Sequence, residues 1–265
     1  MRPFAISLAA ALLAAPAAAA PVVVELFTSQ GCSSCPDADA LLSRWGGARF
    51  AKGEVLPLSF DVDYWNYLGW KDAFSAPAYS RRQRDYAAAL GARVYTPQMV
   101  VAGREAFVGS DEGALERAAA RYAAEAPRAR ASVTALPSPA GRLRLRVQAA
   151  RAAPGAGEAR LMLALFENGL VTPVASGENA GRDLRADFVV RRLVDLGPLP
   201  ADGSPLRRAV DERWDPAWSK ARGGAAVFVQ ELPALGVSGA AWAYPLSGAR
   251  MAGGGAAPST AQKPL

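Results

Sequence analysis

Both cysteines of this 265-residue chain stand in one tetrapeptide, Cys32-Ser33-Ser34-Cys35, where an apolar strand gives way to a helix. A disulfide across so short a loop stabilises a fold by only about 2 kcal/mol on the loop-closure formula. The spacing therefore favours a pair that opens and closes over one that fastens a large domain. Because the chain has no histidine, a closed zinc site would need carboxylates as its other ligands, which is uncommon. We expect no bound metal and no cofactor.

Residues 1–20 have the pattern of a secretory signal peptide. Arg2 gives a positive start, residues 5–15 are apolar, and residues 17–20 are small. A membrane anchor is the alternative, but the apolar stretch is shorter than the roughly 18 to 20 residues that span a bilayer. We therefore expect a periplasmic or secreted bacterial protein without stable membrane insertion. In such compartments thiol pairs persist as disulfides.

The formal net charge of +6 is modest, and removal of Arg2 with the signal would leave +5. The arginines are spread over both halves of the chain, with no dense basic run and no interleaved aromatic platform. This distribution is typical of a solvated basic surface, so we expect no nucleic-acid partner.

The first half of the chain alternates between strand and helix patterns. The nearly unbroken apolar run at residues 22–27 is typical of a strand covered on both faces. A helix from Cys32 and a strand at 54–62 follow, which implies a right-handed parallel pairing of the two strands. After an aromatic loop at 63–70, the expected elements are a helix at 76–90, a strand hairpin at 98–102 and 105–108, and a helix from Asp111 to about residue 124.

The second half has a different periodicity. Residues 127–139 are rich in Pro, Ser and Ala, which predicts a domain boundary. Beyond it, Leu143, Leu145 and Val147 alternate with arginines, as in a strand with one buried face. We therefore predict a small antiparallel β-sandwich over residues 128–248 and a disordered tail over residues 249–265.

The cysteine pair suits thiol chemistry. A cysteine at a helix start has a lowered pKa, so Cys32 is the expected nucleophile. Cys35 lies three residues later and can resolve a mixed disulfide by attacking the sulfur of Cys32. Glu25, in an otherwise apolar strand, is a candidate proton relay to Cys35 if its carboxylate is unpaired. The alternative for Glu25 is an outward-facing or salt-bridged side chain.

Three segments together resemble a thioredoxin-like domain: VVVELF, GCSSCP at a helix start, and TPQMVVAG opening a hairpin. The resemblance covers about residues 21–127 and implies an α/β thioredoxin-like fold. It also implies that Cys32 is the nucleophile, that Cys35 is the resolving thiol, and that Pro97 is a cis residue beside them. Thr96 would then offer backbone groups to an extended substrate strand.

More narrowly, ELFTSQGCSSCPDAD, DVDYWNYLGWKD and YTPQMVVAG are similar to an uncharacterised family of bacterial secreted proteins built on a thioredoxin-like domain. That family usually has histidine where this chain has Asp61, and again where it has Ala186. These departures argue against a mechanism that requires imidazole and leave dithiol chemistry intact.

Two further segments have a functional and a structural interpretation. Trp65 and Trp70 could form an apolar lip that binds substrate polypeptide beside the redox pair, although such aromatics more often pin a loop to the core. The glycine-rich turn GENAGRD at residues 177–183 could form a small active site or a cation site. An ordered turn with an internal ion pair is the favoured interpretation.

The sequence as a whole favours an exported thiol-disulfide oxidoreductase whose redox pair lies at the exposed tip of the N-terminal lobe. Its partners would be exported protein or peptide thiols and a redox partner protein, with the direction of electron flow undetermined. One alternative is a carrier in which the two thiolates hold Cu(I). Another is a secreted interaction module whose disulfide is inert.

Overall fold

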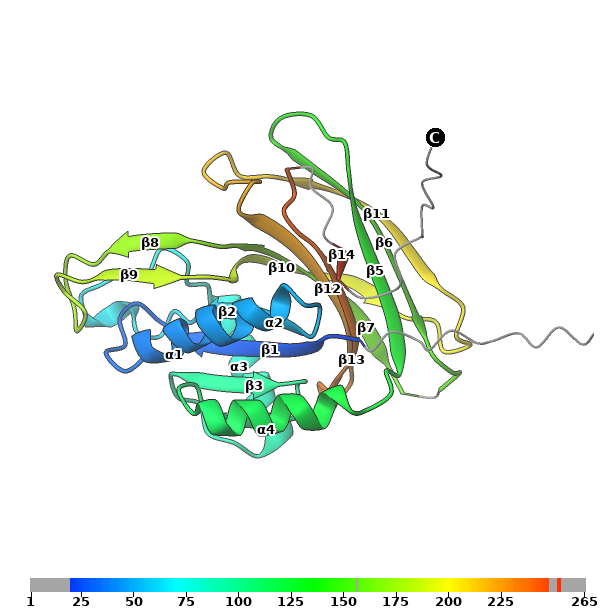
Figure 1. Ribbon diagram of the computed structural model, residues 1–265, viewed down its shortest axis with the longest axis horizontal. Helices are drawn as coiled ribbons and strands as arrows, with labels where there is room; N and C mark the ends of the chain where they lie inside the picture. The colour runs from blue at the N-terminus through cyan, green and yellow to red at the C-terminus, as the bar shows by residue number, and fades with distance from the viewer. Residues whose placement is uncertain (1–19, 156, 248–251, 254–265) are drawn as a thin grey trace, which may run out of the picture.

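The computed structural model describes residues 20–155, 157–247 and 252–253 (Figure 1). Apart from residue 20, the predicted signal peptide lies outside these residues, as does the predicted tail apart from residues 252–253. Along the described parts of the chain, every helix is too short or too polar to cross a membrane.

The first half has the predicted order of strand, helix, strand, helix, strand, strand and helix, with three short additional helical segments. Its elements are β1 (Val22–Thr28), α1 (Pro36–Leu41), a π-helical turn (Leu42–Gly46), α2 (Gly47–Phe50), β2 (Val55–Asp61), a 3-10 turn (Asn66–Leu68), α3 (Pro77–Leu90), β3 (Gln98–Val101), β4 (Glu105–Val108) and α4 (Glu112–Ala123).

Strands β1 and β2 form the centre of this half. Every residue of both strands is buried, as expected for strands covered on both faces, and they pair in parallel from Val22 opposite Val55 to Thr28 opposite Asp61. The helix after β1 begins at Pro36, four residues later than predicted. Proline is well suited to a first helical position because its missing N–H needs no partner there.

The second half is almost entirely strand. Its elements are β5 (Ala129–Leu136), β6 (Arg142–Arg151), β7 (Ala159–Glu167), β8 (Leu170–Pro173), β9 (Asp183–Ala186), β10 (Val189–Pro198), β11 (Leu206–Arg213), β12 (Gly223–Glu231), β13 (Val237–Ala243) and β14 (Ala252–Gly253). Strands β11, β6 and β5 form a three-stranded antiparallel sheet whose apolar face packs on β7 and β12 (Figure 1).

Strands from both halves join into one sheet. Its order is β14-β13-β12-β7-β10-β2-β1-β3-β4, so the predicted boundary near residue 127 does not separate two independent sheets. The junction is the parallel pairing of β10 with β2, where Val189 lies opposite Ser59 and the Ser59 N–H donates a 2.8 Å hydrogen bond to the Phe188 carbonyl. The pairing satisfies backbone groups that an exposed edge of β2 would leave open.

One aromatic cluster also belongs to both halves. Phe27 and Phe60 of the first half lie in the same buried cluster as Phe166, Phe228 and Trp242 of the second half. Burial of such large rings is a major source of stability, so the two halves stabilise each other.

The β8–β9 hairpin stands apart from both larger sheets. Among the described strands, these two four-residue strands pair only with each other, from Leu170 opposite Ala186 to Pro173 opposite Asp183. The hairpin extends away from the three-stranded sheet, and β9 packs beside α1 (Figure 1). It thereby brings residues of the second half next to the segment that carries the cysteines.

Candidate functional site

The two cysteines form a disulfide at the start of the first helical segment. Their Cα atoms are 5.4 Å apart, and Cys35 is the residue that precedes Pro36 at the beginning of α1. The hydroxyl Oγ of Ser34 lies 3.4 Å from Sγ of Cys32, so this side chain faces the sulfur. Helix α1 begins without a side-chain capping bond, so Ser34 does not cap it.

Both cysteines are buried, which corrects the expectation of an exposed tip. Cys32 is 1% exposed and Cys35 is fully buried, whereas Ser33 and Ser34 between them are exposed. The physical reason is the turn after β8, which contacts the cysteine loop from about 145 residues away in the chain. The hydrophobic periodicity of the first half of the sequence cannot predict a contact with so distant a segment.

The Thr96–Pro97 peptide bond is cis and lies close to α1. A Cβ atom built on Gly109 would stand 2.9 Å from Cβ of Pro97 and 3.1 Å from Cβ of Ala38, so Pro97 and the first turns of α1 flank the same glycine. This close approach leaves no room for a side chain at residue 109. The threonine-proline bend and the cysteine segment are thus neighbours.

The aromatic loop after β2 is held against the same region by its two predicted substrate-binding tryptophans. The indole Nε1 of Trp65 donates to Oγ1 of Thr96 at 2.8 Å, and that of Trp70 donates to Oε1 of Gln30 at 3.0 Å. Both rings are half-buried. These bonds fix the loop in place, and the two tryptophans also lie near the cysteine segment. A structural role in the loop is therefore compatible with the predicted substrate-binding role.

Glu25 has a different environment from the one that a proton relay to Cys35 requires. Its carboxylate is fully buried and accepts a bidentate pair of bonds from Arg82 at 2.6 and 2.9 Å, with a third from the Tyr86 hydroxyl at 2.6 Å. Glu25 is therefore salt-bridged, which was the alternative interpretation. Its strand neighbours Val24 and Leu26 pack with α1, whereas Glu25 points to the opposite face of the sheet, where α3 lies.

An acidic group that sequence reasoning missed lies at the ends of β1 and β2, where Asp61 and Asp72 are buried and Asp39 is half-buried. Asp39 accepts a 3.1 Å bond from the Thr28 hydroxyl, and Asp72 accepts a 2.9 Å bond from the Gln30 N–H. Burial raises the pKa of Asp39 to about 7, against a weaker lowering by Thr28. Burial, followed by the nearby carboxylates of Asp72 and Asp39, raises the pKa of Asp61 well above its ordinary value.

Only the position of Asp61 at a strand end could have indicated this group, because Asp39 and Asp72 come from separate segments. On the described residues, no three side chains of His, Cys, Asp or Glu lie close enough together to hold a metal ion.

The glycine-rich turn at residues 177–183 lies directly over the cysteine loop. Oε2 of Glu178 accepts a 3.0 Å bond from the Ser33 N–H, and Nδ2 of Asn179 donates 2.9 Å bonds to the carbonyls of Gln30 and Cys32. Arg182 donates to Oδ1 of Asn179. The favoured interpretation as a turn with an internal ion pair therefore missed its main contacts, which reach a distant segment.

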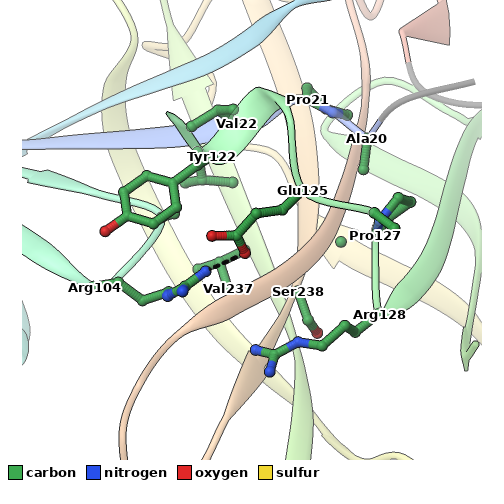
Figure 2. A pocket seen from close by; sticks show the side chains of 14 residues that line it. Ala20, Pro21, Val22, Arg104, Tyr122, Glu125, Pro127, Arg128, Val237 and Ser238 are labelled. Carbon is green, nitrogen blue, oxygen red and sulfur yellow. Dashed lines mark hydrogen bonds and ion pairs between the residues drawn. The ribbon is translucent and has the colours of Figure 1, made fainter. Parts of the chain in front are cut away.

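A small pocket lies at the other end of β1. Val22, Tyr122 and Val237 are among its lining residues, and the Arg104–Glu125 ion pair of 2.5 Å forms part of its wall (Figure 2). Its volume of about 40 Å³ is too small for a substrate. Because the seven residues of β1 separate it from the cysteines by about 20 Å, it belongs to the junction of the two halves.

Known proteins resemble the chain over most of its length. The crystal structure of protein AGR_C_4864 from Agrobacterium tumefaciens, a structural-genomics target, has 31% sequence identity and a TM-score of 0.63, covering 84% of this chain and 94% of that one. HBP35 of Porphyromonas gingivalis is similar in fold at 15% identity and a TM-score of 0.59, covering 84% of this chain and 74% of that one.

No curated protein matches the sequence significantly. The family model described as "Protein of unknown function (DUF1223)" matches residues 23–230, which include the cysteine pair, the threonine-proline bend and the glycine-rich turn at residues 177–183. The chain therefore belongs to the DUF1223 family.

Proposed function

We propose that this protein is an exported thiol-disulfide oxidoreductase with a thioredoxin-like N-terminal region. The observation that carries the proposal is the Cys32–Cys35 disulfide between β1 and α1, with the Thr96–Pro97 bend packed against the same helix. A two-residue spacer between cysteines at a helix start is suited to reversible exchange because the helix end favours the thiolate.

The exchange balances without any further group. A substrate thiolate attacks Sγ of Cys32, a mixed disulfide forms, and Cys35 leaves as a thiolate that takes up a proton. A second substrate thiolate then attacks the substrate sulfur of the mixed disulfide, which releases Cys32 and leaves the substrate oxidised and the protein reduced. Run in reverse, the same steps reduce a substrate disulfide, and a redox partner protein restores the starting state.

Asp39 is suited to exchange a proton with Cys35 during this cycle. It lies four residues after Cys35, and residues at this spacing along a helix share a face. Its raised pKa of about 7 lets the carboxyl of this half-buried residue both hold and release a proton near neutral pH. In this proposal Asp39 replaces Glu25 as the acid-base group.

The test is a trapping experiment with Cys35→Ser, in which Cys32 can form but not resolve a mixed disulfide. A synthetic peptide that contains one internal disulfide is the probe. We expect a one-to-one adduct through Cys32 that dithiothreitol releases, observed by mass spectrometry. Cys32→Ser is the matched control and should form no adduct. Failure of Cys35→Ser to form the adduct would remove the main support for the proposal.

One observation favours a second candidate, an interaction module with an inert disulfide. Both sulfur atoms are buried, whereas exchange requires that an attacking thiolate reach one of them. Complete resistance of the folded protein to dithiothreitol, together with ready reduction after unfolding in urea, would favour this candidate over the oxidoreductase.

A further inference from the structure

The covering turn, residues 174–182 between β8 and β9, bonds to the backbone of Cys32 and of the residues beside it. Asn179 is 1% exposed, and its amide is bonded to the carbonyls on either side of Gly31, those of Gln30 and Cys32. The carboxylate of Glu178 accepts from the N–H of Ser33, the residue that follows Cys32. Any thiol that approaches Cys32 from this side must displace these contacts.

Two backbone hydrogen bonds make the covering turn a closed loop. Backbone bonds of 2.9 Å from Val174 N to Arg182 O and 2.8 Å from Gly181 N to Val174 O close its base. Outside the hairpin its polar anchors include the bond from Gln30 Nε2 to Thr172 and the bond from Ser176 to the Gly69 carbonyl. Short, separate hairpins held by polar contacts open at a lower free energy than central strands.

We infer that the covering turn controls access to the Cys32–Cys35 disulfide, and that Glu178 makes its closed position depend on the redox state of Cys32. The inference rests on the proposed function, since it concerns regulation of the same pair. The oxidised pair is uncharged and tolerates a carboxylate beside it. A Cys32 thiolate is an anion one residue from the N–H that Glu178 occupies, and like charges at this separation repel.

The consequence is a cover that closes over the disulfide and loosens once Cys32 is reduced. Hydrogen bonding to Ser33 lowers the pKa of Glu178, so its carboxyl is charged at neutral pH. Glu178 is exposed to solvent, which screens its charge. We therefore expect the open population of the covering turn to increase severalfold on reduction, without full opening.

The first test measures the second-order rate constant for reduction of the folded protein by dithiothreitol. One thiolate of the reagent attacks the pair and forms a mixed disulfide, and the second closes the reagent into a cyclic disulfide. Two electrons and two protons pass to the cysteines.

We expect Glu178→Ala and Asn179→Ala to raise this rate constant by about threefold to tenfold, the equivalent of one or two lost hydrogen bonds. Asp202→Ala is the matched control, because Asp202 also accepts from a backbone N–H, that of Ser204, in a loop that lacks the cysteines. Rate constants of both variants within twofold of wild type would overturn the inference.

The second test is hydrogen exchange of residues 174–182, followed by mass spectrometry in the oxidised and the reduced protein. We expect faster exchange in the reduced protein, and a smaller redox difference in Glu178→Gln, whose amide oxygen can still accept from Ser33. The double variant Cys32→Ser, Cys35→Ser has neither disulfide nor thiolate, and its turn should exchange like that of the oxidised protein. Equal exchange in both redox states of wild type, or a double variant that matches the reduced protein, would overturn the role of Glu178.

These tests fail separately from the trapping experiment. If the variants speed reduction but Cys35→Ser forms no peptide adduct, the cover stands and the proposed exchange function falls. If the adduct forms but reduction is insensitive to Glu178 and Asn179, the exchange function stands and the cover falls.

Discussion

The indole Nε1 of Trp65 donates a 2.8 Å hydrogen bond to the hydroxyl of Thr96, and so joins the aromatic loop after β2 to the threonine-proline bend. Trp65 also reaches the cysteine loop, since a Cβ atom built on Gly31 would stand 3.2 Å from Cβ of Trp65. One side chain thus connects three segments around the disulfide. The strength of the Trp65–Thr96 hydrogen bond therefore contributes to how stably these three segments are held together.

We predict that Thr96→Val lowers the free energy of unfolding by about 1 kcal/mol, because it removes the acceptor and leaves a half-buried indole N–H without its partner. Thr96→Ser keeps the hydroxyl and should stay near wild type. A double-mutant cycle with Trp65→Phe, measured by urea unfolding, should give a coupling energy of about 1 kcal/mol. Additive effects of the two substitutions would contradict the bond.

Asp39 should make stability depend on pH. Its pKa rises from an ordinary value of 3.8 to about 7 on folding, so between these values the folded protein holds a proton that the unfolded chain has lost. The contribution of Asp39 to the free energy of unfolding is therefore fully present below pH 3.8. It falls as the pH rises towards 7, by about 1.4 kcal/mol per pH unit at most.

Asp39→Asn cannot ionise, so we predict that it gains stability over wild type as the pH is raised. Urea unfolding of the oxidised proteins at about pH 5 and about pH 8 measures this gain, which should be on the order of 1 to 3 kcal/mol. If the difference in the free energy of unfolding between Asp39→Asn and wild type is the same at the two pH values, the carboxyl of Asp39 does not have a raised pKa.

The Glu25–Arg82 pair should be far more important for stability than an exposed pair of the same kind. Arg82→Ala leaves the Glu25 carboxylate buried without its partner, and we expect a loss of about 3 to 5 kcal/mol in the free energy of unfolding. Arg44→Ala is the control, because the side chains of Arg44 and Glu112 are 60% and 46% exposed. It should cost less than about 1 kcal/mol. Similar losses in both variants would contradict the structural role of the buried pair.

The order of elements in the first half could be predicted because it depends on local patterns. The nearly unbroken apolar run of β1 indicates burial, and the glycine after α3 indicates the end of a helix, each within a few residues. The start of α1 was predicted four residues early, since Cys32 and Pro36 both suit a first helical turn. Helix ends depend on local competition between turn and helix, which sequence patterns resolve poorly.

The cysteine pair itself could be identified from the sequence, but its surroundings could not. The carboxylate predicted to act on it, Glu25, bonds to Arg82 on the other face of the sheet, while Asp39 and Asp72 come from separate segments to the end of β1. Strand alternation predicts which residues share a face. It does not predict which distant side chain meets them there.

By itself, the sequence determined the two sulfur atoms, their spacing, and the strand and helix that flank them, because these features follow from residue identity and short-range periodicity. Only the tertiary structure decided that β10 pairs with β2, which merges the two halves into one sheet, and that Glu178 and Asn179 bond to the backbone of the cysteine loop. Contacts between residues about 145 positions apart depend on how the whole chain minimises exposed apolar area and unpaired backbone groups, so no local pattern contains them.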